Sequence, residues 1–144
     1  MIIVYKSTKS KRLNALFILA IVLIIAATVP AFITDIDNVF YIAIGINLLT
    51  LFLLVSIALK TEYKLDATTL YWQSGPFYGK IAVKTIRKIQ HHNGIFVPTL
   101  WKPALNKIGL IISYNKFDDI YISPENEADF IKNLLQINPT IEII

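Results

Sequence analysis

The first 60 residues contain two long, uninterrupted apolar runs. They cover residues 13–34 and 39–59, and only Asp35-Ile36-Asp37-Asn38 separates them. Neither run contains an Asp, Glu, Lys, Arg or His residue. Because a helix rises about 1.5 Å per residue, each run spans roughly 30 Å, which is the thickness of the hydrocarbon core of a bilayer. The pattern predicts a transmembrane hairpin of two antiparallel helices.

Basic residues flank the two runs on one side only. Six of them lie near the outer ends of the runs: Lys6, Lys9, Lys11, Arg12, Lys60 and Lys64. The connecting loop carries two Asp and no basic residue, so the positive-inside rule places both ends of the hairpin in the cytoplasm. We therefore expect a multi-pass protein of the bacterial cytoplasmic (inner) membrane. It would have a basic cytoplasmic N-terminal segment (residues 1–12) and a cytoplasmic domain (residues 60–144), which is the only part expected to hold a water-soluble domain.

A cleaved signal peptide is the alternative to the first span. Basic residues precede an apolar stretch, and Val29-Pro30-Ala31 resembles a cleavage site. Cleavage would invert the topology. The retained hairpin is favoured because the run is long and a second span follows at once.

The composition agrees with a membrane anchor followed by a polar domain. Apolar residues make up 55% of the 144 residues, and most of the excess lies before Lys60. The net charge of +4 owes much to the N-terminal cations, which indicate topology and not nucleic-acid binding.

The absence of cysteine is compatible with a reducing cytosol. An anchor is favoured over a transport path because neither run holds an ionisable group.

The polar part of the chain has the pattern of strands followed by one helix. Alternation in residues 61–65 and 70–73 predicts a hairpin, which Ser74-Gly75-Pro76 ends. The period slips at Lys84-Thr85 within residues 80–90, which predicts a bulge or corner between two strands. Residues 108–114 and 117–122 predict a second hairpin, giving five or six strands in all.

An amphipathic helix is expected near the C-terminus. Ser123 suits the N-cap and Pro124 the first helical position, while Asn138-Pro139 would end the helix. One face is apolar and comprises Ala128, Phe130, Ile131, Leu134 and Leu135. The fold class is therefore α+β: a two-helix transmembrane hairpin, then a small antiparallel β-barrel or curled sheet closed by one C-terminal amphipathic helix.

Several segments of this domain resemble a known family. They are Tyr63-Lys64-Leu65-Asp66, Ser74-Gly75-Pro76-Phe77, residues 80–86, Ile120-Tyr121-Ile122-Ser123-Pro124, Phe130 and Asn138-Pro139. Together with the hairpin they resemble the YyaB-like family of bacterial pleckstrin-homology-like (PH-like) membrane proteins. The family's Ala-Leu-Ser-Leu-Asp-Arg-Leu stretch is matched only at Ala104-Leu105, where Asn106-Lys107-Ile108-Gly109 then follows. The resemblance implies a PH-like fold and does not imply an activity.

Candidate catalytic chemistry is sparse. The neighbours His91 and His92 would point to opposite faces of a strand, and no Cys or third His completes a metal site. Asp118 and Asp119 would diverge in the same way. No nucleophile motif, phosphate-binding glycine loop or zinc-protease motif occurs. We therefore expect a protein that is not an enzyme, with no catalytic residue, metal or cofactor.

An apolar loop is the segment that suggests binding. Residues 93–107 contain two prolines and a glycine, yet also Ile95, Phe96, Val97, Leu100 and Trp101. These side chains either fill one end of the barrel or dip into the lipid headgroups. Basic residues would extend such an interface toward anionic lipid. The candidate lipid or partner contacts are Phe96, Trp101, Lys102, Lys80, Lys84, Arg87 and Lys88.

Two functions remain open at this point. The first is a membrane-anchored binding module that presents a PH-like domain to a lipid headgroup or a membrane or cytoplasmic protein partner. The second is a structural accessory or immunity-type membrane protein that acts through its hairpin. Nucleic acid is not an expected partner in either case, and the pattern leaves the oligomeric state open.

Overall fold

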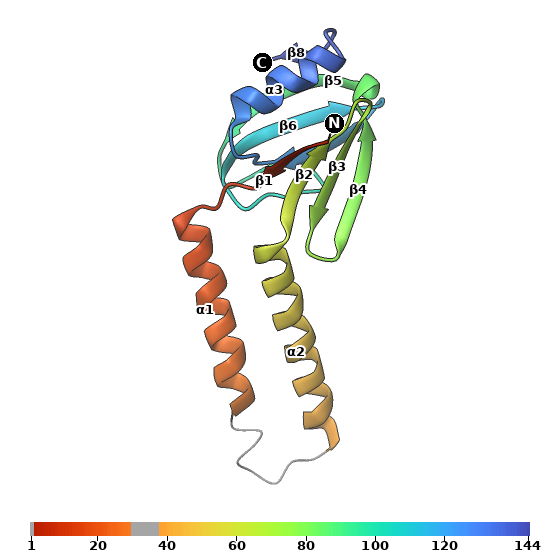
Figure 1. Cartoon of the computed structure of the whole chain (residues 1–144). Helices are drawn as coiled ribbons and strands as arrows, with labels where there is room; N and C mark the ends of the chain where they lie inside the picture. The colour runs from red at the N-terminus through yellow and green to blue at the C-terminus, as the bar shows by residue number, and fades with distance from the viewer. Residues whose placement is uncertain (1, 30–37) are drawn as a thin grey trace.

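Two helices leave one end of a β-rich domain in the computed structural model (Figure 1), which describes residues 2–29 and 38–144. Helix α1 (Lys11–Thr28) and helix α2 (Asn38–Leu59) run side by side in opposite directions. In the described residues, one helical stretch, Tyr41–Leu59, is long and apolar enough to cross a membrane, and no part of it is buried. Asn14–Thr28 is a shorter apolar helix. Residues 30–37, which include the end of the first predicted span and Pro30-Ala31, lie outside the described residues.

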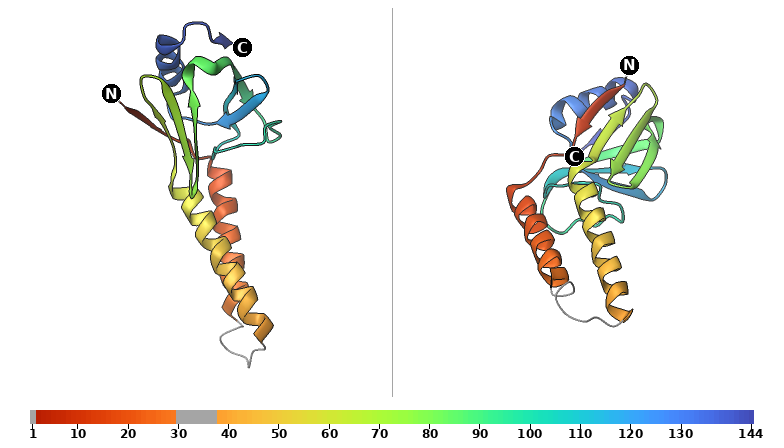
Figure 2. Two further views of the ribbon diagram at one scale, coloured as in Figure 1. Left: turned by 90° about the vertical axis from the view of Figure 1, so that its right-hand side faces the viewer. Right: turned by 60° about the horizontal axis from the view of Figure 1, so that its bottom comes forward.

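The domain contains two four-stranded sheets (Figure 2). The first has the order β1-β2-β3-β4 and is antiparallel throughout: β1 (Ile3–Lys6), β2 (Thr61–Leu65), β3 (Thr69–Ser74) and β4 (Phe77–Ala82). The second has the order β7-β6-β5-β8: β5 (Ile86–Asn93), β6 (Ile108–Tyr114), β7 (Asp118–Ile122) and β8 (Glu142–Ile143). Strand β8 runs parallel to β5, whereas β5 pairs antiparallel with β6, and β6 pairs antiparallel with β7. The predicted barrel is therefore replaced, in the described residues, by two separate sheets.

The two predicted β-hairpins and the predicted corner between strands are confirmed. Strand β2 pairs with β3, and β6 with β7. The slip in periodicity at Lys84-Thr85 corresponds to the 3-10 helix η2 (Val83–Thr85), where the chain turns from one sheet into the other. The described residues contain eight strands and not five or six, because β1 and β8 were not predicted. Segments of four and two residues are too short for alternation to reveal them.

Strand β1 precedes the helical hairpin but belongs to the domain. Its Tyr5 is opposite Tyr63 of β2, and the phenol of Tyr5 donates to Oδ2 of Asp129 at 2.8 Å. Farther along, the backbone N–H of Thr8 donates to the carbonyl of Ser123 at 2.7 Å. The expectation that residues 60–144 alone hold the domain is therefore wrong, since the N-terminal segment completes the first sheet.

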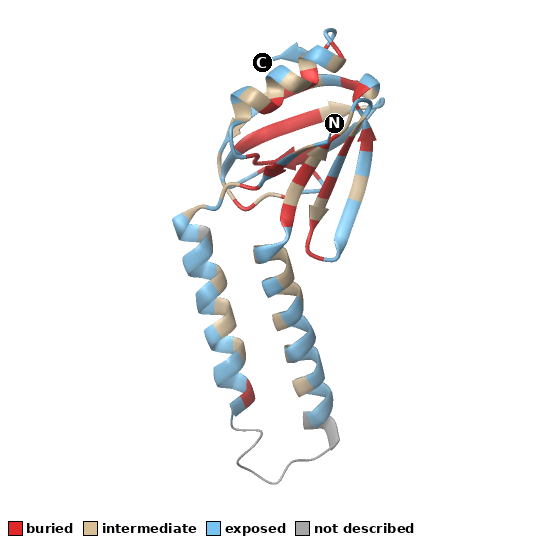
Figure 3. Ribbon diagram, viewed as in Figure 1, coloured by how far each residue is buried: buried red, intermediate tan, exposed pale blue. Residues whose placement is uncertain are grey.

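The core lies between the two sheets and helix α3 (Glu127–Ile137) (Figure 3). The largest fully buried side chains include Tyr63, Leu70, Ile89, Leu110, Phe130 and Leu134. Phe130 and Leu134 confirm the predicted apolar face of the helix, and Ile131 and Leu135 pack against the same core. Ala128, expected on that face, is exposed.

Helix α3 begins later than predicted. Its N-cap is Asn126, with φ of +65°, whose side chain accepts a hydrogen bond from the N–H of Asp129. Ser123 does not cap the helix, because its hydroxyl lies 2.9 Å from that of Ser7 and the segment after it pairs with the N-terminal chain. The N–H of Glu125, for example, donates to the carbonyl of Lys6 at 2.8 Å. The predicted end at Asn138 is confirmed, and its amide donates to the carbonyls of Val83 and Ile86.

Candidate functional site

Helix α2 passes into strand β2 without a linker. The helix ends at Leu59 and the strand begins at Thr61. The N–H of Lys60 donates to the carbonyl of Ser56 at 2.8 Å, and the hydroxyl of Thr61 donates to that of Ile57 at 2.6 Å. These bonds continue the helical pattern into the strand, so the orientation of the domain is fixed relative to α2.

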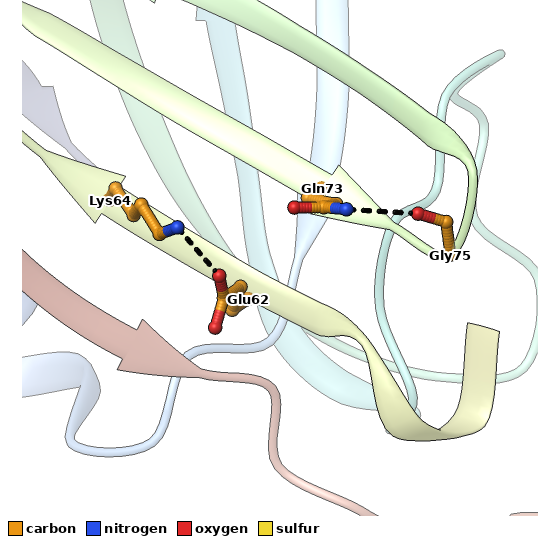
Figure 4. Close-up of polar contacts among 4 residues, drawn as sticks. All are labelled: Glu62, Lys64, Gln73 and Gly75. Carbon is orange, nitrogen blue, oxygen red and sulfur yellow. Dashed lines mark hydrogen bonds and ion pairs between the residues drawn. The ribbon is translucent and has the colours of Figure 1, made fainter. Parts of the chain in front are cut away.

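The turn between β3 and β4 rests against the end of α2. Gly75 has φ of +58°, and a Cβ built on it would lie 2.9 Å from the backbone nitrogen of Ile57. Its N–H donates to the carbonyl of Lys60 at 2.8 Å, and its carbonyl accepts from the Gln73 side chain at 3.1 Å (Figure 4). Only glycine permits this close approach. Tyr78, which follows the turn, is 81% exposed. An aromatic side chain is therefore accessible to solvent near the turn that contacts α2.

Loop 94–107 lies at the same end of the domain, beside the start of α1 (Figure 2). The N–H of Gly94 donates to the carbonyl of Lys107 at 3.0 Å and closes the loop at its base. The N–H of Ser10, the N-cap of α1, donates to the carbonyl of Leu105 at 3.1 Å. The loop is thus attached both to the second sheet and to the first turn of the helix.

Some apolar side chains of the loop are buried and others are open to solvent. Val97 packs with Ile111 and Tyr121 in a small second core, and Leu105 is buried. Ile95, Phe96 and Leu100 are 94%, 84% and 88% exposed. The two interpretations of the loop therefore apply to different residues. Val97 and Leu105 fill one end of the domain, while Ile95, Phe96 and Leu100 present apolar side chains to solvent.

The exposure of Trp101 is intermediate between that of the buried and that of the exposed apolar side chains of the loop. Its indole packs against that of Trp72 with ring centroids 5.6 Å apart, and the side chain remains 47% exposed. Its carbonyl accepts from the N–H of Tyr121 at 3.0 Å. Trp101 is therefore held against the sheet with one edge in the open, next to the exposed Lys102.

A pocket of about 330 Å³ separates loop 94–107 from the first turns of α1. Apolar side chains form one part of its wall: Leu16, Ile95 and Val97. Cationic side chains form another: Arg12, Lys102 and Lys107. No acidic residue lines the pocket in the described part of the chain. Its chemistry combines an apolar surface with concentrated positive charge.

Tyr121 forms part of the inner wall of this pocket. Burial raises the pKa of its phenol to about 12, and the negative charge of Glu127 adds to the effect. The neutral hydroxyl donates to the carbonyl of Asn106 at 3.0 Å. The ring of His92 meets that of Tyr121 edge to face at 5.7 Å, and within the described residues Nε2 of His92 is buried without a hydrogen-bond partner.

The predicted basic contacts do not form one surface with the loop. Lys84, Arg87 and Lys88 lie in η2 and at the start of β5, at the far end of the domain from the helices (Figure 1). Arg87 donates to the carbonyl of Lys116 at 2.9 Å. Lys80 is on the outer face of β4, whereas the next residue, Ile81, is buried. Among the candidates, Phe96, Trp101 and Lys102 belong to loop 94–107, and the others lie elsewhere, because β5 carries the chain from the far end of the domain back toward the helices.

The histidine pair behaves as strand geometry requires. Nδ1 of His91 lies 3.5 Å from a carboxylate oxygen of Glu127, whereas His92 packs on Tyr121. The described residues contain no cluster of three or more His, Cys, Asp or Glu side chains that would hold a metal. Asp118 and Asp119 are both exposed.

The sequence interpretation missed the contribution of α1 to the site. Arg12 was assigned a role only in topology, and Leu16 only in the first span. Both line the pocket opposite residues that follow some 80 to 110 positions later. A single sequence holds no signal for that contact, because it depends on the pairing of β1 with β2.

Comparison with known proteins places residues 61–138 in a recognised family. They match the family model described as Bacterial PH domain. No curated protein matches the chain, and no solved structure does so either. The matched region runs from β2 to the end of α3. It leaves out β1, α1 and α2, which precede β2 in the chain.

Proposed function

This chain belongs to the bacterial PH domain family, and from that premise we propose a non-enzymatic binding module held at the cytoplasmic face of a bacterial membrane by a transmembrane hairpin. The PH fold is generally a binding module, which supports a role in recognition. Within the family we propose the YyaB-like group, on the sequence segments that resemble it. The expected partners are a lipid headgroup or a membrane or cytoplasmic protein.

The pairing of β1 with β2 is the observation that carries the proposal. Strand β1 precedes α1 and strand β2 follows α2, yet the two are neighbours in one sheet. The two ends of the helical segment therefore lie on the same side of any membrane it enters. If α2 crosses the bilayer, the chain has to cross a second time, and the apolar run 13–34 is the segment available for that crossing.

The same pairing argues for retention of the N-terminal segment. Cleavage near residue 31 would remove β1, and with it the hydrogen bond from Tyr5 to Asp129 and the contact between the hydroxyls of Ser7 and Ser123. The first sheet would lose an edge strand and expose β2. The cations on either side of the hairpin favour the cytoplasm for the domain.

Single-cysteine labelling in intact cells tests the topology, and the chain offers a cysteine-free background. We expect an impermeant thiol reagent to label Asp37→Cys in intact cells. It should label Lys9→Cys and Lys132→Cys only after permeabilisation, since both residues are on the domain side of the helices. Labelling of Lys9→Cys and Lys132→Cys but not of Asp37→Cys would invert the topology. Opposite results for Lys9→Cys and Lys132→Cys would refute the hairpin.

The alternative function, an accessory or immunity-type protein acting through the hairpin, has one observation in its favour. Ile46 and Phe52 of α2 are 60% and 63% exposed, so this part of the helix surface is open to a partner helix. Affinity capture with the full chain from detergent extracts separates the two functions. Loss of the captured partner in Phe96→Ser/Leu100→Ser supports the binding module. Loss only in Ile46→Ala/Phe52→Ala supports the hairpin.

A further inference from the structure

The pocket between α1 and loop 94–107 lies where a helix passes from charged to apolar residues. Arg12 and Leu16 are four positions apart, so they lie one turn apart on the same face of α1. Arg12 borders the apolar run that begins at residue 13, and Leu16 belongs to it. In a membrane-spanning α1, this pair of residues marks the boundary between the headgroups and the acyl chains.

The opposite wall of the pocket also combines cationic and apolar side chains. Lys102 and Lys107 supply the charges, and Ile95 and Val97 the apolar surface. Ile95 is almost wholly exposed, although it lies on the side of the domain nearest the helices. Because exposure of an apolar side chain to water is unfavourable, Ile95 would be stabilised by contact with an apolar chain.

The cations around the pocket form no ion pair with any other described residue. Within the described residues, the ion pairs are Lys64–Glu62 and His91–Glu127, and neither involves Arg12, Lys102 or Lys107. Three cations around one small pocket favour an anion, and long basic side chains hydrogen-bond phosphate oxygens well. The apolar wall beside them favours an anion that carries a hydrocarbon chain.

We propose that this pocket binds one anionic phospholipid. Its phosphate would contact Arg12, Lys102 and Lys107, and the upper part of one acyl chain would lie along Leu16 and Ile95. The proposal rests on the proposed membrane anchoring, since a bilayer supplies the ligand. It adds a specific lipid site formed jointly by the first helix and the domain, which holds the domain against the membrane surface.

Native mass spectrometry of the full chain, released from mild detergent, measures this binding directly. The probes are phosphatidylglycerol and phosphatidylcholine with the same acyl chains. We expect one phosphatidylglycerol to bind at least tenfold more tightly than phosphatidylcholine. Lys102→Gln/Lys107→Gln should weaken that binding by more than tenfold, because each cation near anionic lipid contributes about fivefold. Equal affinity for the two lipids would overturn the proposal.

A matched control separates a specific site from general charge attraction. Lys84→Gln/Lys88→Gln changes the net charge by the same amount at the far end of the domain. It should leave phosphatidylglycerol binding unchanged, and an equal loss in both double variants would overturn the proposal. Ile95→Ser should also weaken binding, whereas Phe117→Ser, at another highly exposed apolar residue, in the β6–β7 turn, should not. Equal effects of these two variants would likewise count against it.

Two further measurements distinguish the possible failures. Millimolar inorganic phosphate should not displace the lipid, and displacement would show a site for a free phosphate ion instead. Membrane fractionation and thiol labelling of the same variants report the anchoring independently. Intact anchoring without preference for phosphatidylglycerol rejects the lipid site alone, whereas loss of anchoring in the unmodified chain rejects the proposed function as well.

Discussion

The indole rings of Trp72 and Trp101 pack at 5.6 Å between centroids, with an angle of 42° between their planes. Trp72 belongs to the first sheet, and its ring also covers Gly79, where a Cβ would lie 2.6 Å from it. Trp101 belongs to loop 94–107. The contact therefore connects the loop to the sheet that continues directly from α2, and it holds the loop at the helical end of the domain.

Trp101→Ala should lower the free energy of unfolding by about 1–3 kcal/mol, because it removes an aromatic contact and part of a packed surface. Phe96→Ala, which truncates an 84% exposed side chain of the same loop, should change it by about 0.5 kcal/mol or less. Urea unfolding of the full chain in detergent, followed by circular dichroism, compares the two. Equal losses would mean that the Trp72–Trp101 contact does not hold the loop.

Leu134→Ala should cost about 2–5 kcal/mol, since Leu134 is fully buried between α3 and the sheets. Lys132→Ala, on the exposed face of the same helix, should change stability by about 0.5 kcal/mol or less. The same unfolding measurement tests both. A similar cost for the two variants would contradict the packing of α3.

The stability of the domain should fall as the pH rises from about 10 to about 12. Burial raises the pKa of Tyr121 from its ordinary value of 10.0 to about 12 in the folded chain. In that interval the unfolded chain releases a proton that the folded chain keeps, so the free energy of unfolding decreases with pH. Below pH 10 both states keep the proton and the contribution is complete. Burial also raises the pKa of Tyr63, which acts in the same direction.

Tyr121→Phe isolates this contribution. It should reduce stability at neutral pH by about 1 kcal/mol through the lost hydrogen bond to the carbonyl of Asn106. It should also flatten the fall in stability between about pH 10 and 12 relative to the unmodified chain. Urea unfolding at a series of pH values measures both effects. An unchanged slope in Tyr121→Phe would show that Tyr121 does not contribute.

The hydroxyls of Ser7 and Ser123 should be energetically coupled. They lie 2.9 Å apart, and both accept from the N–H of Leu105, at 3.1 and 3.3 Å. A double-mutant cycle of Ser7→Ala and Ser123→Ala should show a coupling energy of about 0.5–1.5 kcal/mol. Ser7→Ala combined with Thr140→Ala, which shares no partner with it, should be additive within about 0.5 kcal/mol. Additivity in both pairs would contradict the shared network.

The parts of the fold that the sequence predicted depend on short-range information. Alternation identified β2 and β3, and the slip at Lys84-Thr85 identified the corner at η2, because each pattern lies within a few residues. Ser123 was misread as a helix cap because its actual partners, Ser7 and Leu105, are distant in the chain. Strand β1 was missed because it is only four residues long and because its partner β2 is also distant in the chain.

The candidate site was predicted only in part, for a related cause. Apolar residues in a loop are unusual, so the sequence alone indicated Phe96 and Trp101 as candidate contacts. Arg87 and Lys88 were grouped with them because basic side chains would extend the interface toward anionic lipid, but they lie at the start of β5, at the opposite end of the domain. Arg12 and Leu16 could be placed at the pocket only by a structure that pairs the two ends of the hairpin.

The pairing of Tyr5 with Tyr63 also constrains how the protein is made. If the proposed transmembrane hairpin forms, strand β1 is synthesised well before β2 and cannot pair with it until both helices have been inserted. A chain with only one helix inserted would leave Tyr5 and Tyr63 in different compartments. The edge of β2 would then stay open, and an open edge invites aggregation or recognition by chaperones and proteases. In the proposed topology, a completed first sheet would thus form only after both helices have been inserted.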